Sequence, residues 1–577
     1  MMEMNEVLDK LPRHLLSLVI DQPYNDYTEQ DHAVWRYVMR QNVEYLSKVA
    51  YGSYLDGLKR TGIVIERIPH MYGMNRILKE IGWAAVAVDG FIPPAAFMEF
   101  QAYNVLVIAA DIRPIDQIEY TPAPDIIHEA AGHAPIIADP IYSAYLSRFG
   151  EIGAKAFSSA RDYTQYEAIR HLSILKADPY SSRDSIELAE RHLAEIEKNM
   201  GNPSEMALLR NLHWWTVEYG LIGDLKKPKI YGAGLLSSIG ESYSCLKDEV
   251  LKLPYSIEAV NYSFDITTRQ PQLFVTPNFD HLTGVLEQFT SFMAFRRGGL
   301  YGVQSAINSG NVGTCEFSSG LQVSGVFNEV LAEGTQPVYL RTNSPSQLAW
   351  NGKQLPGHGK DYHAHGFGSP VGKFKGSGIP PEFLSANELE TMGIISGKKV
   401  RIDFESGVVV TGMLDKILSQ RNSNLLFTFS DCLVTYKDKV LFEPSWGRFD
   451  MAVGEKISSA YSGPADPDAF DYSFLAPKEK THKLIHTPEV LNLHRMYGFT
   501  RQYRESGTEI SHLFSFWRDV KHSYPDEWLL PLEILEIATK SGYDDLADEI
   551  RIYLIEKQQQ DASLVNLISN GLSLVDK

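Results

Sequence analysis

The stretch PDIIHEAAGHAP, residues 124–135, carries two histidines five positions apart, with a glutamate directly after the first. In the zinc-hydrolase pattern H-E-x-x-H the histidines stand four apart and share one helix face. On a regular helix, residues five apart are ~140° out of phase, against ~40° for residues four apart. Gly132 and Pro135 predict that the helix unwinds and ends there, which aims His128 and His133 at one metal ion. The alternative is a pair of structural histidines.

A metal site needs further ligands, and two classes of protein are open. A zinc hydrolase would use Glu129 as its base and a third ligand nearby. A non-haem iron oxygenase uses two histidines and one carboxylate on one face of the metal. NLHWWTVEYGLIG, residues 211–223, supplies Glu218 among aromatic and apolar neighbours, where an unpaired charge is costly. The alternative for Glu218 is a solvent-facing position on an amphipathic helix.

A third stretch, IYGAGLLSSIGES at residues 230–242, is a near miss of a dinucleotide-binding fingerprint. It lacks the final glycine, a preceding strand and a βαβ context, so nucleotide binding is not expected. Its small residues and paired serines instead suit a close approach of the backbone. They also suit a hydrogen bond to a ligand or to a histidine ring.

The composition is typical of a folded protein of several domains: 577 residues, 44% hydrophobic and 22% charged. The net charge of −18 argues against a nucleic-acid partner. The three cysteines (Cys245, Cys315, Cys432) lie too far apart for a disulfide framework or a cysteine-rich zinc site. With no apolar run long enough for a membrane and no signal-peptide pattern, we expect a cytoplasmic protein without a membrane partner.

Hydrophobic periodicity indicates a mostly helical first part and a helical last part. One helix is predicted after Thr28, a capping residue followed by acids, and another over residues 184–200, capped by Asp184 and stopped by Gly201. Near the end of the chain, one helix face is expected to carry Leu546, Ile550, Tyr553 and Leu554.

The pattern between about residues 310 and 455 alternates between apolar and polar residues, which is typical of antiparallel strands. GKKVRIDFESGVVVTGML predicts a hairpin that turns at residues 406–407 and buries one face, formed by Val400, Ile402 and Phe404. The Gly- and Pro-rich stretch before it predicts a loop. In that loop, His358, His363 and His365 either form a second metal site or lie there without a shared function. The Gly-rich composition favours histidines without a shared function.

Taken together, these segments resemble the tetrahydropterin-dependent aromatic amino acid hydroxylases, the family of phenylalanine, tyrosine and tryptophan hydroxylases. YTPAPDIIHEAAGHAP is similar to the metal-binding signature of the family, and WWTVEYGL to the segment of its third iron ligand. YGAGLLSSIGE is similar to the following active-site segment, and YTEQDHAVWRYVMRQ and GFIPPAAF resemble the bacterial branch. The resemblance covers roughly residues 20–305.

The resemblance implies roles for individual residues. His128, His133 and Glu218 would bind iron, and Arg113 would pair with the substrate carboxylate, a bidentate task that suits a guanidinium. The substrate would also contact Thr121, Trp214, Tyr219 and Ser237. The pterin would contact Gly90, Ile92, Phe97 and Glu129, and a surrounding layer would consist of His213, Ser238 and Glu241.

Three features depart from the family pattern. His133 and Glu218 are separated by 84 residues, more than in the animal enzymes, and the extra helical segment could cover the site or form a subunit contact. His213 stands where the family usually has a tyrosine, and it could tune oxygen activation, add a ligand or be harmless. Ala95 and Ala96 replace polar or charged residues before Phe97.

We expect an α+β protein in three parts. Residues 1–308 would form a mainly helical hydroxylase catalytic domain with a helical insertion at about 160–205. Residues 309–460 would form a small antiparallel β domain of unknown role, and 461–577 a helical C-terminal segment. The last two parts have no counterpart in the family.

The implied activity is an aromatic amino acid monooxygenase that uses Fe(II), tetrahydrobiopterin or a related tetrahydropterin, and O₂. The bacterial resemblance favours conversion of L-phenylalanine to L-tyrosine, with tryptophan or tyrosine hydroxylation open, and a homo-oligomer also open. Two other classes are rivals: a zinc-dependent hydrolase using His128, Glu129 and His133, and a non-catalytic ligand-binding protein on a hydroxylase fold. Metal content and pterin dependence distinguish the three.

Overall fold

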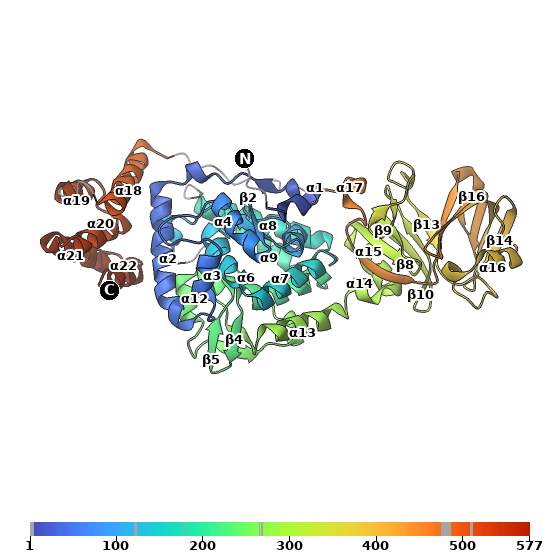
Figure 1. Ribbon diagram of the computed structural model, residues 1–577, viewed down its shortest axis with the longest axis horizontal. Helices are drawn as coiled ribbons and strands as arrows, with labels where there is room; N and C mark the ends of the chain where they lie inside the picture. Colours follow the sequence, from blue (N-terminus) through green and yellow to red (C-terminus); the bar gives the residue numbers. More distant parts are fainter. Residues whose placement is uncertain are drawn as a thin grey trace.

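The computed structural model describes residues 5–119, 124–178, 181–264, 266, 269–474, 486–507 and 512–576. A helix-rich part occupies the centre of the elongated molecule, with the strands of the β-rich part on one side and the last helices on the other (Figure 1). This mixture of helices and separate sheets confirms the predicted α+β class. The division of the chain near residues 308 and 460 stays our proposal. In the described part of the chain, no helix is both long and apolar enough to cross a membrane.

The central part surrounds two small sheets with helices. In one sheet β1 (Val19–Ile20) pairs with β2 (Ala84–Val88), which runs parallel to β3 (Val105–Ala109). The other sheet has the order β5 (Lys227–Ile230), β4 (Leu221–Asp224), β7 (Gln272–Thr276), β6 (Leu251–Pro254). The helices are α1 (Arg13–Leu16), α2 (Glu29–Val49), α3 (Tyr54–Arg60), α4 (Met71–Leu78), α5 (Pro94–Ala102), α6 (Ala134–Ile137), α7 (Pro140–Gly153), α8 (Ala160–Ala177), α9 (Arg183–Lys198), α10 (Glu205–His213), α11 (Ala233–Ser237), α12 (Ile239–Ser244), α13 (Phe279–Thr290) and α14 (Ala294–Arg297).

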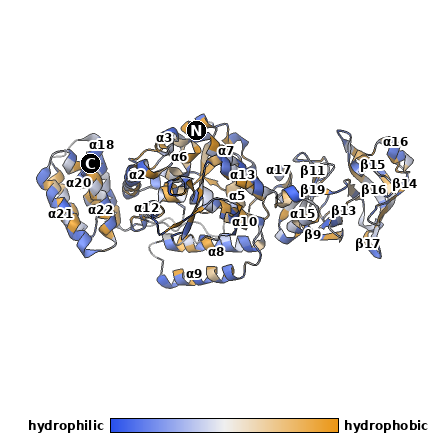
Figure 2. Cartoon of the chain, turned by 90° about the horizontal axis from the view of Figure 1, so that it is seen from below, coloured by the Kyte–Doolittle hydropathy of each residue, from blue (hydrophilic) through white to orange (hydrophobic). Residues whose placement is uncertain are grey.

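The two helices predicted in the first part of the chain are confirmed. Thr28 caps α2 in a capping box with Asp31, as the sequence indicates. The helix predicted over residues 184–200 is α9, but its cap is Ser182, whose hydroxyl accepts from the Ser185 amide, and not Asp184. α9 lies outside α8 at the edge of the molecule (Figure 2), and its apolar side chains Ile186, Leu193 and Ile196 are only half-buried.

The β-rich part consists of two antiparallel sheets, as predicted. A seven-stranded sheet contains β8 (Val312–Phe317), β9 (Leu321–Glu333), β10 (Gln336–Thr342), β11 (Gln347–Trp350), β12 (Lys353–Gln354), β13 (Gly368–Pro370) and β19 (Ile457–Ser462), and α15 (Gly299–Ser309) packs on it. A five-stranded sheet contains β14 (Lys399–Asp403), β15 (Val408–Gln420), β16 (Ser423–Tyr436), β17 (Lys439–Phe442) and β18 (Phe449–Ala452). The predicted hairpin is β14–β15, with its expected face buried. Two short helices, α16 (Ala386–Thr391) and α17 (Pro467–Phe470), complete this part.

The last helices pack against α2 and not against the β-rich part (Figure 1). They are α18 (Pro488–Ser506), α19 (Leu513–Ser523), α20 (Leu529–Lys540), α21 (Asp544–Gln560) and α22 (Leu564–Val575). The face predicted for α21 is buried, and it belongs to the same hydrophobic core as the central helices. At this contact Arg36 of α2 donates to Glu533 and Glu536 of α20, each at 2.7 Å, and Arg40 donates to Glu536 at 2.6 Å.

Acidification is expected to weaken the contact between α2 and α20. Burial opposes ionisation of Glu536, but hydrogen bonding and charge from Arg36 and Arg40 outweigh it and lower its pKa to about 2. This value lies below ~4.3, the ordinary value of an unfolded chain. The ion pairs therefore stabilise the folded chain fully above that ordinary pKa, and the stabilisation is lost as the pH falls through the folded value. We expect the free energy of unfolding to decrease across this window.

The measurement is urea unfolding of the full chain from about pH 7 down to about pH 3. Glu536→Gln should remove this part of the pH dependence and lower the free energy of unfolding at pH 7 by about 3 kcal/mol, because it breaks a buried ion pair. Asp576→Asn is the control, since its pair with Arg551 is exposed and worth about 0.5 kcal/mol. An unchanged pH dependence in Glu536→Gln would contradict the assignment.

Candidate metal and pterin site

HEAAGH forms a π-helix, His128–His133, inside a helix that continues into α6. The Ala134 amide donates to the Glu129 carbonyl, five residues earlier, where an α-helix bonds four residues earlier. In such a wide turn, residues five apart lie on the same face. The prediction that the helix ends at the second histidine is therefore wrong, because the helix widens instead and brings His128 and His133 together.

Gly132 and Pro135 have roles other than unwinding the helix. A Cβ on Gly132 would lie 2.6 Å from the Ala233 carbonyl oxygen, so glycine here lets α11 pack directly on the π-helix. Pro135 has no amide to donate to the preceding turn. The Tyr54 hydroxyl donates to the Ala131 carbonyl there, at 3.2 Å. Tertiary contacts thus stabilise the widened turn.

The third predicted ligand lies on a second π-helix, Trp214–Glu218, which continues from α10. Its widened turn is closed by the Tyr219 amide, which donates to the Trp214 carbonyl at 2.8 Å. Glu218 is buried and not solvent-facing. The following glycine segment packs closely here, since a Cβ on Gly232 would lie 2.5 Å from the Glu218 carbonyl oxygen. The close backbone approach expected from this segment is confirmed.

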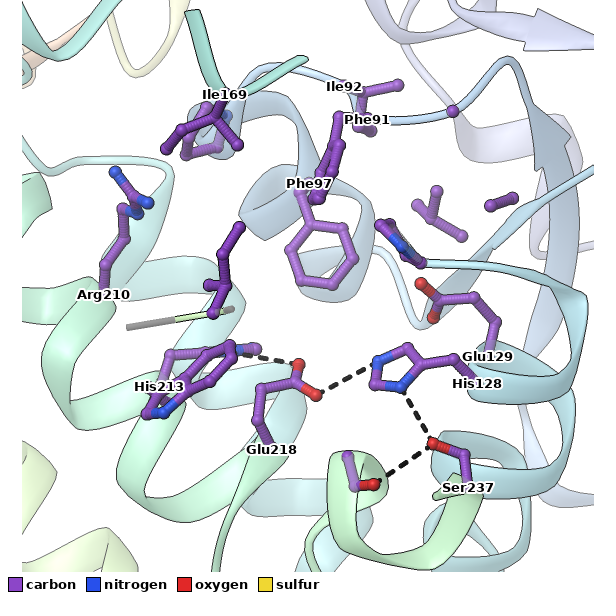
Figure 3. A pocket seen from close by; sticks show the side chains of 18 of the residues that line it. Phe91, Ile92, Phe97, His128, Glu129, Ile169, Arg210, His213, Glu218 and Ser237 are labelled. Carbon is purple, nitrogen blue, oxygen red and sulfur yellow. Dashed lines mark hydrogen bonds and ion pairs between the residues drawn. The ribbon is translucent and has the colours of Figure 1, made fainter. Parts of the chain in front are cut away.

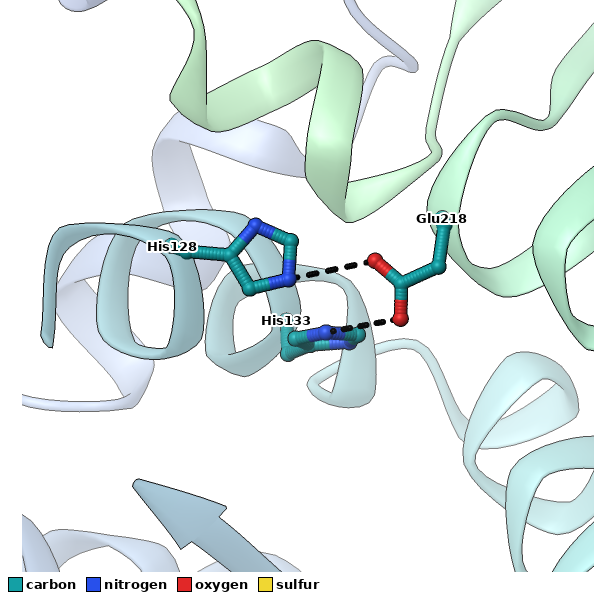
Figure 4. A group of neighbouring side chains, drawn as sticks. All are labelled: His128, His133 and Glu218. Carbon is teal, nitrogen blue, oxygen red and sulfur yellow. Dashed lines mark ion pairs between the residues drawn. The ribbon is translucent and has the colours of Figure 1, made fainter. Parts of the chain in front are cut away.

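The three predicted iron ligands converge on one point (Figure 4). Glu218 Oε2 lies 3.1 Å from His128 Nε2, and Glu218 Oε1 lies 3.4 Å from His133 Nε2. Burial alone would raise the pKa of the Glu218 carboxyl, but the two imidazoles outweigh it and hold that pKa well below its usual range. His133 Nε2 is buried and lacks a hydrogen-bond partner among the described residues. An ionised carboxylate facing two imidazole nitrogens, one of them unsatisfied, fits a divalent transition metal.

Ser237 orients the first histidine. Its hydroxyl donates to the Ala233 carbonyl at 2.8 Å and lies 3.0 Å from His128 Nδ1, so it accepts the imidazole proton there (Figure 3). This holds the proton on Nδ1 and leaves Nε2 with a free lone pair toward Glu218. From the sequence, this segment was expected to hydrogen-bond either a ligand or a histidine ring. The contact between Ser237 and His128 confirms the second alternative.

Arg113 lies beside the metal ligands but is already engaged. Its Nε and Nη2 donate to the two carboxylate oxygens of Asp125, each at 2.8 Å, and Nη1 donates to the Ser237 carbonyl at 3.2 Å. Asp125 also accepts from the His128 amide at 2.9 Å, which fixes the start of the π-helix. Nη1 also donates to the Ile118 carbonyl at 3.5 Å, so both protons of Nη1 have acceptors, and a substrate carboxylate would meet the remaining proton of Nη2. Thr121 lies outside the described residues.

A cavity of about 260 Å³ extends from the metal ligands, and the predicted pterin residues line it. Phe97 and Ile92 lie on one side of the cavity and Glu129 lies beside His128 (Figure 3), and Gly90 also lines the cavity. Burial raises the pKa of Glu129 to about 8, so near neutral pH this group is a proton donor and not the ionised base of a hydrolase. The cavity is mostly apolar, which suits flat aromatic ligands.

Trp214 and Tyr219, the two aromatic residues that the resemblance assigns to the substrate, form an aromatic wall of the cavity. The Trp214 and Tyr219 rings stack with centroids 4.5 Å apart, and Phe264 stacks on Trp214 at 4.2 Å. Glu241 accepts from the Tyr219 hydroxyl at 2.5 Å. Ser238 accepts from the Glu241 amide at 3.4 Å, so Ser238 and Glu241 act on the wall through Tyr219.

His213 lies beside Glu218 because these two residues stand five positions apart across the second π-turn, just as His128 and His133 do across the first. Its Nδ1 is 3.7 Å from Glu218 Oε1, and its ring packs edge-on against Phe97 and Phe149. Burial lowers its pKa to about 4, which keeps the imidazole neutral. Among the described residues, the compact group of candidate ligands consists of His128, His133 and Glu218 and does not include His213.

Helix α8, in the segment that separates the metal ligands, covers the cavity. Tyr166 and Ile169 line it, the Tyr166 hydroxyl donates to the Phe91 carbonyl at 2.9 Å, and Arg170 donates to the Asp89 and Phe91 carbonyls. These contacts hold the loop of Gly90 and Ile92, next to the alanines that replace polar residues in the family pattern. The helix over residues 184–200, which was expected either to cover the site or to form a subunit contact, is α9. It lies outside α8 (Figure 2), and its described residues do not line the cavity, so α8 covers the cavity in its place and a subunit contact through α9 stays a prediction.

Sequence reasoning missed Tyr166, Arg170 and Arg210. Arg210 lies on α10 and faces the cavity (Figure 3), and the structure records no hydrogen bond to its guanidinium among the described residues. Burial lowers its pKa from the ordinary value. Spacing in the sequence could not reveal that the half-buried Arg210 faces the cavity, because neither α8 nor α10 carries a recognisable motif there.

The fold and the site define a class: an α+β protein whose apolar pocket ends on two histidines and a carboxylate arranged for a transition metal. The sequence model of the biopterin-dependent aromatic amino acid hydroxylases matches residues 20–173 and 187–298. The match to that family is limited to these residues, which make up somewhat less than half of the chain.

Named relatives agree with this match. The phenylalanine-4-hydroxylase of Pseudomonas aeruginosa is 28% identical over 264 residues, which cover 45% of this chain and 84% of that protein. The enzyme of Chromobacterium violaceum is 27% identical over 266 residues, 46% of this chain and 75% of that protein. A crystal structure of the latter, with iron(III) and 7,8-dihydrobiopterin, aligns at 25% identity and a TM-score of 0.38, covering 49% of this chain and 89% of that one.

Ser237→Ala is expected to weaken metal binding by about 10- to 100-fold, because His128 loses the partner that sets its tautomer. The measurement is an anaerobic Fe(II) titration of the full chain. Ser242→Ala is the matched control, since Ser242 is buried on the neighbouring helix and donates only to the Ile239 carbonyl. Equal affinities for the two variants would show that Ser237 does not orient the ligand.

Proposed function

We propose that this chain is a pterin-dependent aromatic amino acid monooxygenase that converts L-phenylalanine to L-tyrosine with Fe(II), a tetrahydropterin and O₂. The observation that carries the proposal is the convergence of His128, His133 and Glu218 at the end of the cavity. The family match and the phenylalanine-4-hydroxylase relatives support the reaction and the cofactors. Bound iron and tetrahydropterin supply the electrons and the activation of O₂ that place one oxygen atom on the ring.

The residues of the chain bind and orient the reactants. The two imidazoles and the carboxylate would hold iron on one side, which leaves the positions toward the cavity open. The Trp214–Tyr219 stack would provide a flat apolar surface for the substrate ring, and the positive charge of Arg113 would attract its carboxylate, with the remaining Nη2 proton available to it. Holding the ring and the carboxylate at separate points would orient the ring relative to His128, His133 and Glu218.

The pterin would lie between Phe97 and the loop of Gly90 and Ile92, with Glu129 next to its polar edge. A neutral carboxyl at Glu129 can donate a hydrogen bond to a ring nitrogen or carbonyl of the cofactor. α8 closes the cavity above this position, which keeps water away from the metal.

We also propose a cytoplasmic location and no nucleic-acid or membrane partner. The three cysteines are all buried and unpaired, as a reducing compartment allows, and the net charge is −18. A homo-oligomer stays part of the proposal.

Anaerobic reconstitution with Fe(II), followed by a tetrahydropterin and oxygen, tests the activity, with phenylalanine, tyrosine and tryptophan supplied in turn. We expect tyrosine from phenylalanine, identified by mass, and at least a 1,000-fold loss of activity in Glu218→Ala, because iron loses its carboxylate ligand (an order-of-magnitude figure). Glu287→Ala, at a half-exposed glutamate far from the cavity, is the control. Peptidase activity that needs zinc and no pterin, or no product from any amino acid, would sink the proposal.

Arg170→Ala is expected to raise the KM for the pterin by about tenfold, since the loop loses hydrogen bonds to a buried charge. The KM for phenylalanine should change by less than about twofold, because Arg170 does not touch that side of the cavity. Arg161→Ala, an exposed arginine of the same helix that donates to the Met200 carbonyl, is the control. Equal effects on both KM values would assign Arg170 a general structural role.

A further inference from the structure

The β-rich part contains a second cluster of metal-binding side chains, far from the cavity. His358, His363 and Asp450 each offer a ligand atom, and these atoms lie within 4.8 Å of one another. His358 Nδ1 is 3.2 Å from His363 Nε2. Two imidazole nitrogens bound to one metal at ordinary Zn–N lengths lie about 2.9–3.4 Å apart. The side chains therefore have the spacing of a coordinated pair.

The loop predicted from the glycines and prolines is present, and backbone hydrogen bonds hold it to the sheet. Leu348 of β11 donates its amide to the His358 carbonyl at 2.9 Å, and Ser346 donates to the His363 carbonyl at 3.1 Å. Gly366 has a φ of +106° and packs against the Thr342 carbonyl, so the loop returns tightly to the sheet. Both imidazoles thus have fixed positions.

Asp450, the third side chain of the cluster, belongs to the five-stranded sheet. It lies on β18, is 5% exposed, and accepts from Thr428 of β16 at 2.6 Å. Tyr362 also donates to it. No lysine or arginine among the described residues forms an ion pair with Asp450. A buried carboxylate without a cation is costly, and the nearest groups able to complete its surroundings are the two histidines.

We propose that His358, His363 and Asp450 bind a divalent transition-metal ion of the zinc type. The ion joins the loop of the seven-stranded sheet to β18 of the five-stranded sheet and so clips the two sheets together. His358 binds through Nδ1 and His363 through Nε2, and half-buried His358 leaves a path for water to a fourth position. His365, the third histidine of the sequence pattern, is exposed and lies outside the group.

The test isolates this site from the catalytic one. The full chain with His128→Ala and His133→Ala loses two of its catalytic ligands, is loaded with Zn²⁺ or Co²⁺, is desalted, and its metal content is measured by mass spectrometry. We expect about one ion per chain and, with Co²⁺, visible bands of a nitrogen- and oxygen-ligated ion that a chelator removes. With both catalytic histidines intact, the content should rise to about two ions per chain.

Adding His363→Ala to that chain should abolish the Co²⁺ bands, and adding Asp450→Asn should weaken Zn²⁺ binding by at least about tenfold. His365→Ala is the matched control from the same loop and should bind normally. If His363→Ala alters the circular dichroism, His358→Ala at the half-buried position replaces it. No retained metal in the first variant, or equal binding with and without the two histidines, would show that His358 and His363 form only a hydrogen bond to each other. The metal-binding test does not depend on hydroxylase activity, because the variants without His128 and His133 are expected to lack that activity already.

Discussion

Two imidazoles five residues apart can face one point from a single helix only if the helix is wider than an α-helix. The π-turn at His128–His133 meets this constraint, and a second π-turn brings Glu218 to the same point. A widened turn is unstable by itself, because its backbone packs less well. It persists here because α11 packs on Gly132 and Tyr54 satisfies a carbonyl that Pro135 leaves free.

The same packing connects metal binding with the substrate side of the cavity. Ser237 at the end of α11 orients His128, and its carbonyl accepts from Arg113. Asp125 links Arg113 to the amide of His128. Each of these buried polar groups therefore has a hydrogen-bond partner within one network, which offsets the cost of burying it.

The parts of the chain outside the family match are attached in different ways. The C-terminal helices share a hydrophobic core with α2 and add a buried ion-pair network around Arg36. The β-rich part has hydrophobic clusters of its own and is joined to the centre through α14 and α15. None of the described residues of these two parts lines the cavity.

The sequence by itself determined the α+β class, two of the helices and the β14–β15 hairpin, because periodicity and local motifs depend on neighbouring residues, and its resemblance to a known family supplied the three candidate metal ligands. It did not determine how His128 and His133 meet, since a π-turn depends on Gly132 and Tyr54 contacts from distant segments. For the same reason Asp450, 87 positions after His363, became visible as a candidate ligand only when two sheets packed together. Tertiary structure decides such groups because their members share no local pattern, only a point in space.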